Sequence, residues 1–297
     1  MNRNRIILFL FTTFILLFPV NIYASGYCEE LISELGTARI IDQDSGKQIA
    51  WLERPGEDVE PGAVTTKKYV YFCTYRVVKK TYDMKEDNEC FLYRYDIETE
   101  KTKRLLTFPG KQFDYYRVGH LYKNKLYIMG YVNGEDTAEF SYDLKTKKFE
   151  KVMDDLSHQG AYKQYIIMSN AILLSSDYHA HPVYVYNIET KRLKKIMEQA
   201  SLYYLDRENL LIKYYVDTEN GDRTSKEFLY NVATGKKEKI DTINGDRVSI
   251  YRLVQNCLYG YNMDKSEYFK YNRKTKVYKK ISLKALNNAL VGWKEYY

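Results

Sequence analysis

The stretch Phe140-Ser141-Tyr142-Asp143-Leu144-Lys145-Thr146 decides the fold, because closely similar stretches recur through the chain. In each copy an aromatic strand ends in Tyr-Asp or Tyr-Asn, and a polar turn follows it. Aromatic residues that alternate with polar ones are typical of a half-buried strand. Asp or Asn after such a strand can bond its own backbone and start a turn. The other copies lie at 93–99, 184–190, 229–234 and 269–275.

The spacing of the copies indicates the architecture. The tyrosines at the strand ends are separated by 47, 44, 44 and 41 residues, and they are Tyr95, Tyr142, Tyr186, Tyr230 and Tyr271. Each unit has room for four short strands. Four-stranded units with a period of about 40–50 residues are typical of an all-β protein of the β-propeller class. Counting the strands predicts six antiparallel blades, with five or seven as the alternatives.

The two ends of the chain complement each other. A weaker copy at 40–46 supplies the third and fourth strands of one blade. The stretch 283–297 supplies a first and a second strand. We therefore expect a single propeller domain over residues 38–297, after a lead-in at 25–37. One blade shared between the N-terminal and C-terminal strands would close the ring.

The beginning of the chain has the pattern of an export signal. Arg3 and Arg5 precede an apolar run at 6–20, and the small residue Ala24 follows. This pattern predicts a signal peptide at residues 1–24. The run is shorter than the roughly 20 residues that a membrane span requires, although an uncleaved anchor is the alternative. We expect a secreted or extracytoplasmic monomer, free or attached to the cell surface.

Charge argues against one class of partner. The chain has 46 Lys and Arg against 39 Asp and Glu, a net charge of +7, and the two signs alternate along it. A block of basic residues, as in nucleic-acid-binding segments, is absent from the sequence. We expect no nucleic acid as a partner and no membrane span after the signal is removed.

Export permits disulfides, and the chain has four cysteines. Cys73 and Cys90 flank one predicted hairpin and are candidates for a disulfide across two strands. Cys28 and Cys257 would then remain as the second pair. Free thiols are the alternative, because a core of this size does not need disulfides.

Function in a propeller usually lies on the loops of one face. Here these loops are rich in acidic residues, which suits cationic groups, although such sequences also make tight turns. A cluster of histidines on these loops is the most specific candidate for a functional site. His158, Asp177, His179 and His181 have the donor types that bind Zn²⁺ or another transition metal. A second candidate, for calcium, is the acidic loop with Asp217, Glu219, Asn220 and Asp222, which lacks part of the usual calcium-loop pattern.

The repeat Tyr-[Asp/Asn]-x-x-Thr-x-Lys resembles that of secreted bacterial β-propellers of the TolB-like type. It also resembles the low-density-lipoprotein-receptor-related propeller domain of unknown function in exported clostridial proteins. The resemblance covers roughly residues 38–297 and implies architecture, without catalytic residues to carry over.

The sequence contains no nucleophile elbow, P-loop or dinucleotide fingerprint. We therefore expect a non-enzymatic module, without a resident cofactor, that binds a protein or a cell-surface glycan through its loop face. The alternative is a metal-dependent hydrolase or lyase that uses the His158, His179 and His181 cluster, in which case a divalent metal would be the cofactor.

Overall fold

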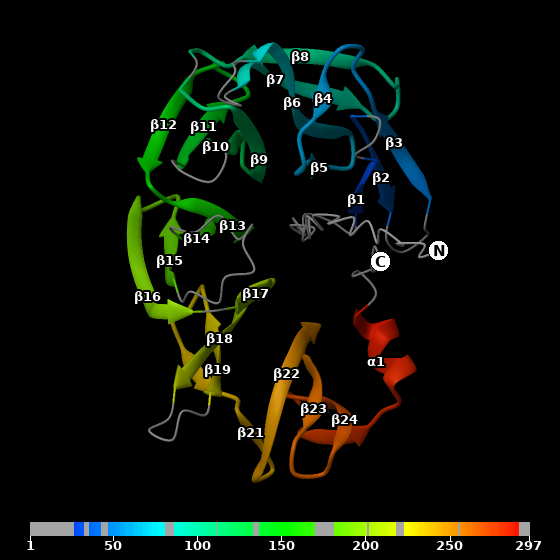
Figure 1. Cartoon of the computed structure of the whole chain (residues 1–297), viewed down its shortest axis with the longest axis vertical. Helices are drawn as coiled ribbons and strands as arrows, with labels where there is room; N and C mark the ends of the chain where they lie inside the picture. Colours follow the sequence, from blue (N-terminus) through cyan, green and yellow to red (C-terminus); the bar gives the residue numbers. More distant parts are fainter. Residues whose placement is uncertain are drawn as a thin grey trace, which may run out of the picture.

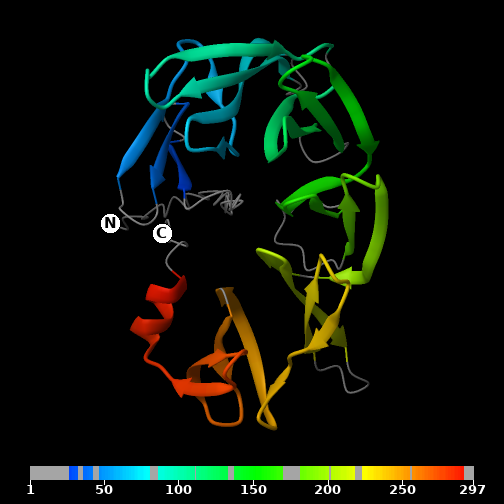
Figure 2. The same cartoon turned by 180° about the vertical axis from the view of Figure 1, so that it is seen from behind.

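The computed structural model describes residues 27–32, 36–42, 47–80, 86–110, 112–132, 137–169, 181–200, 202–217, 223–254 and 256–290. Within these residues the protein is all-β, as the sequence predicts, apart from one short helix. The strands form six antiparallel sheets that follow one another in chain order. Figure 1 shows the sheets arranged around a ring, and Figure 2 shows the same ring from behind.

The first three sheets are built from the N-terminal half of the chain. The first has the order β1 (Tyr27–Ile32), β2 (Thr37–Asp42), β3 (Gln48–Leu52). The second has the order β4 (Asp58–Val59), β6 (Tyr69–Lys80), β7 (Glu86–Asp96), β8 (Thr102–Thr107), and β5 (Val64–Thr65) also pairs with β6. The third contains β9 (Tyr115–Tyr122), β10 (Lys125–Tyr131), β11 (Thr137–Asp143) and β12 (Phe149–Asp154).

The other three sheets come from the C-terminal half. The fourth contains β13 (Ser157–Tyr162), β14 (Tyr165–Ser169), β15 (His181–Asn187) and β16 (Arg192–Ala200). The fifth contains β17 (Leu202–Asp206), β18 (Asn209–Asp217), β19 (Arg223–Asn231) and β20 (Lys237–Lys239). The sixth contains β21 (Thr242–Ile243), β22 (Asp246–Val254), β23 (Cys257–Asn262), β24 (Glu267–Asn272) and β25 (Val277–Lys280).

The repeated motif forms the predicted strand and turn. In all five copies the side chain after the tyrosine accepts two backbone N–H groups, from the residues two and three positions later. Asp143, for example, accepts from Lys145 at 2.9 Å and from Thr146 at 2.8 Å. These bonds fix the turn between the third and fourth strands of each sheet.

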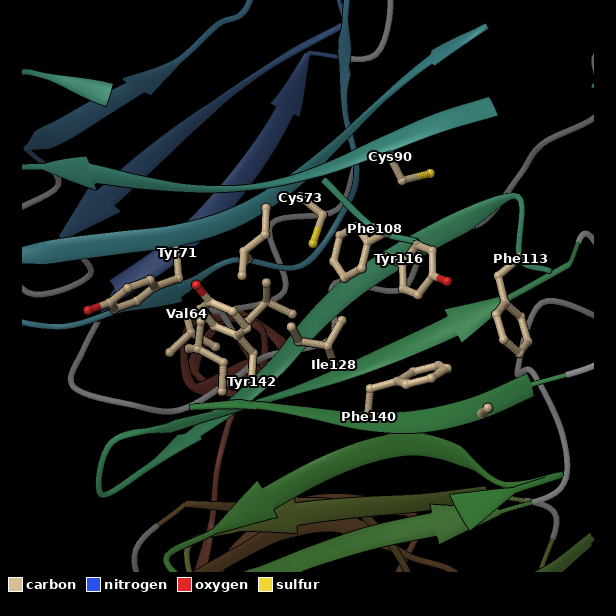
Figure 3. Close-up of a cluster of buried hydrophobic side chains, with 14 residues drawn as sticks. Val64, Tyr71, Cys73, Cys90, Phe108, Phe113, Tyr116, Ile128, Phe140 and Tyr142 are labelled. Carbon is tan, nitrogen blue, oxygen red and sulfur yellow. The ribbon is translucent and has the colours of Figure 1, made fainter. Parts of the chain in front are cut away.

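The core lies between the sheets, because each sheet has two apolar faces. Five hydrophobic clusters fill the spaces between successive sheets, from the first to the sixth. Figure 3 shows the cluster between the second and third sheets, where Phe108 and Tyr116 stack with ring centroids 3.8 Å apart. The repeat tyrosine Tyr142 is 1% exposed there. The tyrosine stripe therefore packs one sheet on the next, as expected for sheets that cannot be stable alone.

The prediction of strands at the C-terminal end is wrong for residues 283–290. They form helix α1 (Leu283–Leu290), and residues 291–297 lie outside the described part. Leu283, Leu286 and Leu290 have helical spacing rather than the spacing of a strand. The Ser282 hydroxyl accepts the Ala285 N–H at 3.1 Å and caps the helix, while Leu286 is 2% exposed.

The N-terminal boundary also differs from the predicted one. β1 lies within the expected lead-in, and it pairs with β2 over its whole length, from Tyr27 opposite Asp42 to Ile32 opposite Thr37. The first sheet thus has three strands from the N-terminal end instead of two. The signal peptide predicted at residues 1–24 lies outside the described residues. Among the described helices, none is long and apolar enough to cross a membrane.

Candidate functional site

A tight turn on the loop between the first and second sheets begins the candidate site. Pro55 and Gly56 occupy its two central positions, and Gly56 has a positive φ of 73°. The Glu57 N–H donates to the Arg54 carbonyl at 3.0 Å and closes the turn. Pro followed by Gly with positive φ is the sequence that a type II turn requires.

Side chains of the second sheet hold this turn in place. The Glu57 carboxylate accepts the Tyr93 hydroxyl at 3.1 Å and the Thr74 hydroxyl at 2.5 Å. The Arg54 guanidinium lies over the Tyr93 ring, 4.8 Å from its centroid. Burial and the nearby Glu57 carboxylate raise the pKa of Tyr93, so its hydroxyl stays a donor at neutral pH.

An open cleft of 420 Å³ lies against the turn. We call it the loop-face cleft. Glu53, Asp58 and Arg76 are exposed in its lining, and Arg76 also pairs with Glu89. Charged groups of both signs thus meet solvent in a hollow whose wall is fixed by hydrogen bonds. The lining residues are Glu53, Arg54, Pro55, Gly56, Glu57, Asp58, Tyr75, Arg76 and Val77.

A buried carboxylate, Glu60, follows the cleft in sequence and is only 4% exposed. The Tyr131 hydroxyl donates to it, and an Arg117 guanidinium nitrogen lies 3.6 Å from the same oxygen. Burial raises the pKa of Glu60, although Arg117 and Tyr131 oppose that effect. Gly62 leaves room for this pair, because a Cβ there would lie 2.5 Å from Arg117 Cγ.

A row of tyrosines leads from the cleft to Glu60. Tyr75 lines the cleft and meets Tyr115 edge-on, with centroids 4.9 Å apart. Tyr115 stacks on Tyr131 at 5.3 Å. Aromatic contacts of this kind make the wall between the second and third sheets rigid.

Two further buried glutamates connect neighbouring sheets. Glu139 Oε1 on β11 lies 3.3 Å from His158 Nδ1 on β13, and both side chains are almost completely buried. Glu227 on β19 accepts the Ile250 N–H of β22 at 2.7 Å and pairs with Lys213 at 2.9 Å. Burial raises the pKa of Glu227, which Lys213 opposes. Each glutamate thus reaches the first long strand of the next sheet.

Neither glutamate belongs to a motif that the sequence predicts as a site, although the sequence carries a signal for both. Both stand three residues before a repeat tyrosine, in Glu139-Phe140-Ser141-Tyr142 and Glu227-Phe228-Leu229-Tyr230. Alternation places them on the face opposite the phenylalanine, so they point towards the following sheet. Only the packing of the sheets shows that this face is buried.

Two members of the predicted histidine cluster, His158 and His181, lie within the described residues, on strands of the fourth sheet. His158 is buried on β13, where it pairs with Glu139, rather than on an open loop. His181 begins β15 in register with Ala200 and is partly exposed. Asp177 and His179 lie outside the described residues. No group of three His, Cys, Asp or Glu side chains suited to a metal occurs in the described part of the chain.

Most of the predicted calcium loop also lies outside the described residues. Asp217 ends β18, and Glu219, Asn220 and Asp222 fall in a segment that is not described.

The predicted disulfide between Cys73 and Cys90 is not formed, because both residues are free thiols in the structure. Cys73 is opposite Leu92 and Cys90 is opposite Tyr75, so the two cysteines are displaced by two positions along the strands. Figure 3 shows their side chains pointing in different directions. Cys257, predicted to pair with Cys28, is free as well.

No protein-family model matches the sequence, and no curated protein matches it. Solved structures do match the fold. The propeller domain of the trilobed protease from Pyrococcus furiosus has 14% identity and a TM-score of 0.49, covering 83% of this chain and 76% of that one. An oligogalacturonate lyase in complex with manganese has 12% identity and a TM-score of 0.50, with coverage of 83% and 70%. A prolyl endopeptidase has 13% identity and a TM-score of 0.53, with coverage of 87% and 39%.

These likenesses define the class of protein. The chain has the fold of a β-propeller, in which successive antiparallel sheets surround an axis. At these identities the comparisons show the fold alone, since propellers serve enzymes and binding proteins alike.

Proposed function

We propose that this protein is a secreted, TolB-like β-propeller that binds a protein or a cell-surface glycan through the loop-face cleft and catalyses no reaction. The observation that carries the proposal is the cleft itself, an open hollow with exposed Glu53, Asp58 and Arg76 on a fixed turn. Rigid loops on a scaffold favour binding because little conformational entropy is lost on association.

The buried carboxylates support a structural role rather than catalysis. Glu60 faces Arg117 and Tyr131, Glu139 faces His158, and Glu227 faces Lys213. In each case the partner belongs to the protein, and the contact spans two strands or two sheets. Catalytic acids and bases must instead reach a substrate.

The scaffold in this proposal is a monomeric ring of six blades. The first sheet has three strands in the described residues, whereas the other five have at least four. We propose that residues 291–297 supply its remaining strand along the free edge of β1 and so close the ring. This arrangement keeps the predicted shared blade and moves the C-terminal contribution beyond α1.

Charge reversal in the cleft tests the binding function. Asp58→Lys together with Arg76→Glu changes two exposed side chains, so folding should be preserved. The protein of residues 25–297 would be immobilised, and captured surface proteins or glycans would be identified and then titrated in purified form. We expect the double variant to bind the identified partner at least tenfold more weakly. The control Lys279→Glu, an exposed position on the outermost strand β25, should bind it as the unchanged protein does, and equal loss in both variants would contradict the proposal.

The alternative, a metal-dependent hydrolase or lyase, predicts a different response. Metal that binds only the native state raises its stability by about 2.7 kcal/mol at a hundredfold excess over Kd. We expect Zn²⁺, Mn²⁺ and Ca²⁺ to leave the unfolding temperature unchanged. A saturable rise that is lost in His181→Ala would favour the alternative instead.

A further inference from the structure

The face of the ring opposite the loop-face cleft is made of repeated turns. In five sheets a backbone N–H in the turn between the third and fourth strands donates to a carbonyl in the turn between the first and second long strands. Leu144 donates to Asn124 at 2.8 Å, and Ile188 donates to Gln164 at 2.8 Å. Both kinds of turn therefore lie on one face, which we call the turn face. It consists of residues 66–69, 122–125, 162–165, 206–209, 254, 256–257, 96–101, 143–148, 187–192, 231–236 and 272–277.

Neighbouring sheets are also joined on the turn face. Lys123 Nζ lies 2.8 Å from Glu189 Oε1 of the next sheet. The His120 ring forms a hydrogen bond through Nε2 with the Lys163 carbonyl of that sheet, at 2.7 Å. Arg273 pairs with Glu238 of the sheet before it at 2.6 Å. The turns of the third and fourth sheets are thus joined, and the fifth and sixth sheets are joined as well.

Lysine and arginine occupy an unusual backbone conformation on this surface. Among the described residues, eight positions on the turn face have positive φ, and six of them are basic: Lys123, Lys147, Lys163, Lys191, Arg207 and Lys276. Glycine, which adopts this conformation without strain, stands at only one of the eight, Gly235. A left-handed conformation costs other residues roughly 1–2 kcal/mol each. All six basic side chains are exposed, so packing does not explain their presence.

The opposite face has a different chemistry at the same kind of position. Its non-glycine residues with positive φ are Asp155, Asn244 and Ser266 among the described residues. Asn and Asp tolerate this conformation through local hydrogen bonds. Among the described residues, lysine and arginine with positive φ therefore occur only on the turn face.

The carboxylates on the turn face do not balance its cations. Glu150 forms an ion pair with Lys148, which lowers the pKa of Glu150. The charges of Lys125 and Lys191 lower it as well. Glu189 is shared by Lys123 and the Tyr122 hydroxyl, which lower its pKa. Positive charge thus remains in excess where the third and fourth sheets meet.

We propose that the turn face binds a linear anionic polymer outside the cell, one that carries carboxylate or phosphate groups at regular intervals. The cations are exposed, mobile point charges spread over several sheets, whereas a small anion would require donors that converge in a pocket. Release of counterions from the polymer drives such binding, as it does for other polyelectrolytes. This inference is independent of the loop-face cleft, because it concerns the other face.

The strained lysines allow a test in which folding is not at risk. Lys147→Gly, Lys163→Gly, Lys191→Gly and Lys276→Gly combined remove four charges and relieve backbone strain, so the variant should remain folded. The control combines Lys151→Gln, Lys195→Gln, Lys239→Gln and Lys279→Gln, which removes four exposed charges from the outermost strands. The two variants then have the same net charge.

Binding of polyphosphate and of polygalacturonate to residues 25–297 would be measured at several salt concentrations. We expect the turn-face variant to lose at least tenfold in affinity for one or both polymers and to depend less on salt, while the control loses less than threefold. Equal losses in the two variants would overturn the proposal, as would no binding of either polymer at low salt. Binding to vesicles of anionic lipid without binding to the polymers would also overturn it and indicate a membrane surface.

Discussion

Glu139 and His158 form a buried pair across two sheets, with Oε1 of the glutamate 3.3 Å from Nδ1 of the histidine. Glu139 stands in the third strand of its sheet, and His158 stands in the first strand of the following one. Gly119 makes the contact possible, because a Cβ there would lie 2.8 Å from the His158 ring. The pair therefore connects sheets that otherwise meet mainly through apolar side chains.

Removing one member of this pair should destabilise the fold. Glu139→Ala leaves the buried His158 without its partner, and we expect a loss of about 3 kcal/mol in the free energy of unfolding. Urea unfolding measures the loss. As a control, Glu150→Ala at a partly exposed position should change stability by less than about 0.5 kcal/mol. The double variant with His158→Ala should lose less than the sum of the single losses, and simple additivity would refute the pairing.

Acid should weaken the fold through His120. Burial lowers the pKa of His120 from 6.5 to about 4. The His120 ring also forms a hydrogen bond with the Lys163 carbonyl at 2.7 Å. The unfolded chain therefore binds a proton before the folded one does. Stability should fall as the pH drops from 6.5 to about 4, by ~3 kcal/mol from this residue. Unfolding free energies measured over this range should be flatter in His120→Asn, and parallel curves would contradict the assignment.

Exchanging glycine and lysine at equivalent positions of two turns should change the stability of the protein in opposite directions. Gly235→Lys places in the fifth sheet the residue that the third sheet has at Lys147, and the space around Gly235 admits a Cβ. We expect a loss of about 1 kcal/mol, because φ there is 72°. Lys147→Gly should be stabilising by a smaller amount, since glycine also makes the unfolded chain more flexible. Thermal unfolding distinguishes the two, and changes of the same sign would be unexpected.

Ring closure can be tested with a native thiol. Cys28 lies on β1, the edge at which we propose that residues 291–297 pair. Single cysteines at each of those seven positions, in a Cys257→Ser background, should crosslink to Cys28 under mild oxidation only at the position that lies opposite it, because a disulfide does not span a displacement of two positions along paired strands. A cysteine at the exposed Lys284 of α1 is the control and should not react. Crosslinked dimers would instead indicate strand exchange between copies, and the absence of any crosslink would leave the ring open.

The thiols of Cys73 and Cys90 should be inert in the folded protein. Burial raises the pKa of Cys90 to about 12 and that of Cys73 well above its ordinary value. Since the thiolate is the reactive form, alkylation at pH 8 should label neither residue until the protein unfolds. Cys257, which is partly exposed, should react first. Mass spectrometry after timed labelling locates the modified residues, and early labelling of Cys90 would contradict its burial.

The repeat was sufficient to predict the local structure. Period-two aromatic residues that end in Tyr-Asp or Tyr-Asn specify a strand and its turn through contacts within a few residues, and the side-chain bonds of Asp143 are of that kind. The burial of Tyr142 followed from the same pattern. The spacing of Leu283 and Leu286 is helical, whereas the count of strands in the repeat predicts a strand at the same place, and the structure has the helix.

Only the tertiary structure decided which polar residues meet. Glu60 and Arg117 are 57 residues apart in sequence, and no local spacing relates them; their contact depends on how the second sheet packs on the third. The offset of Cys73 from Cys90 depends on strand register, which two neighbouring strands decide together. The pairing of His158 with Glu139 follows from the buried space between two sheets. Local rules thus determined the sheets, and the packing between them determined the sites.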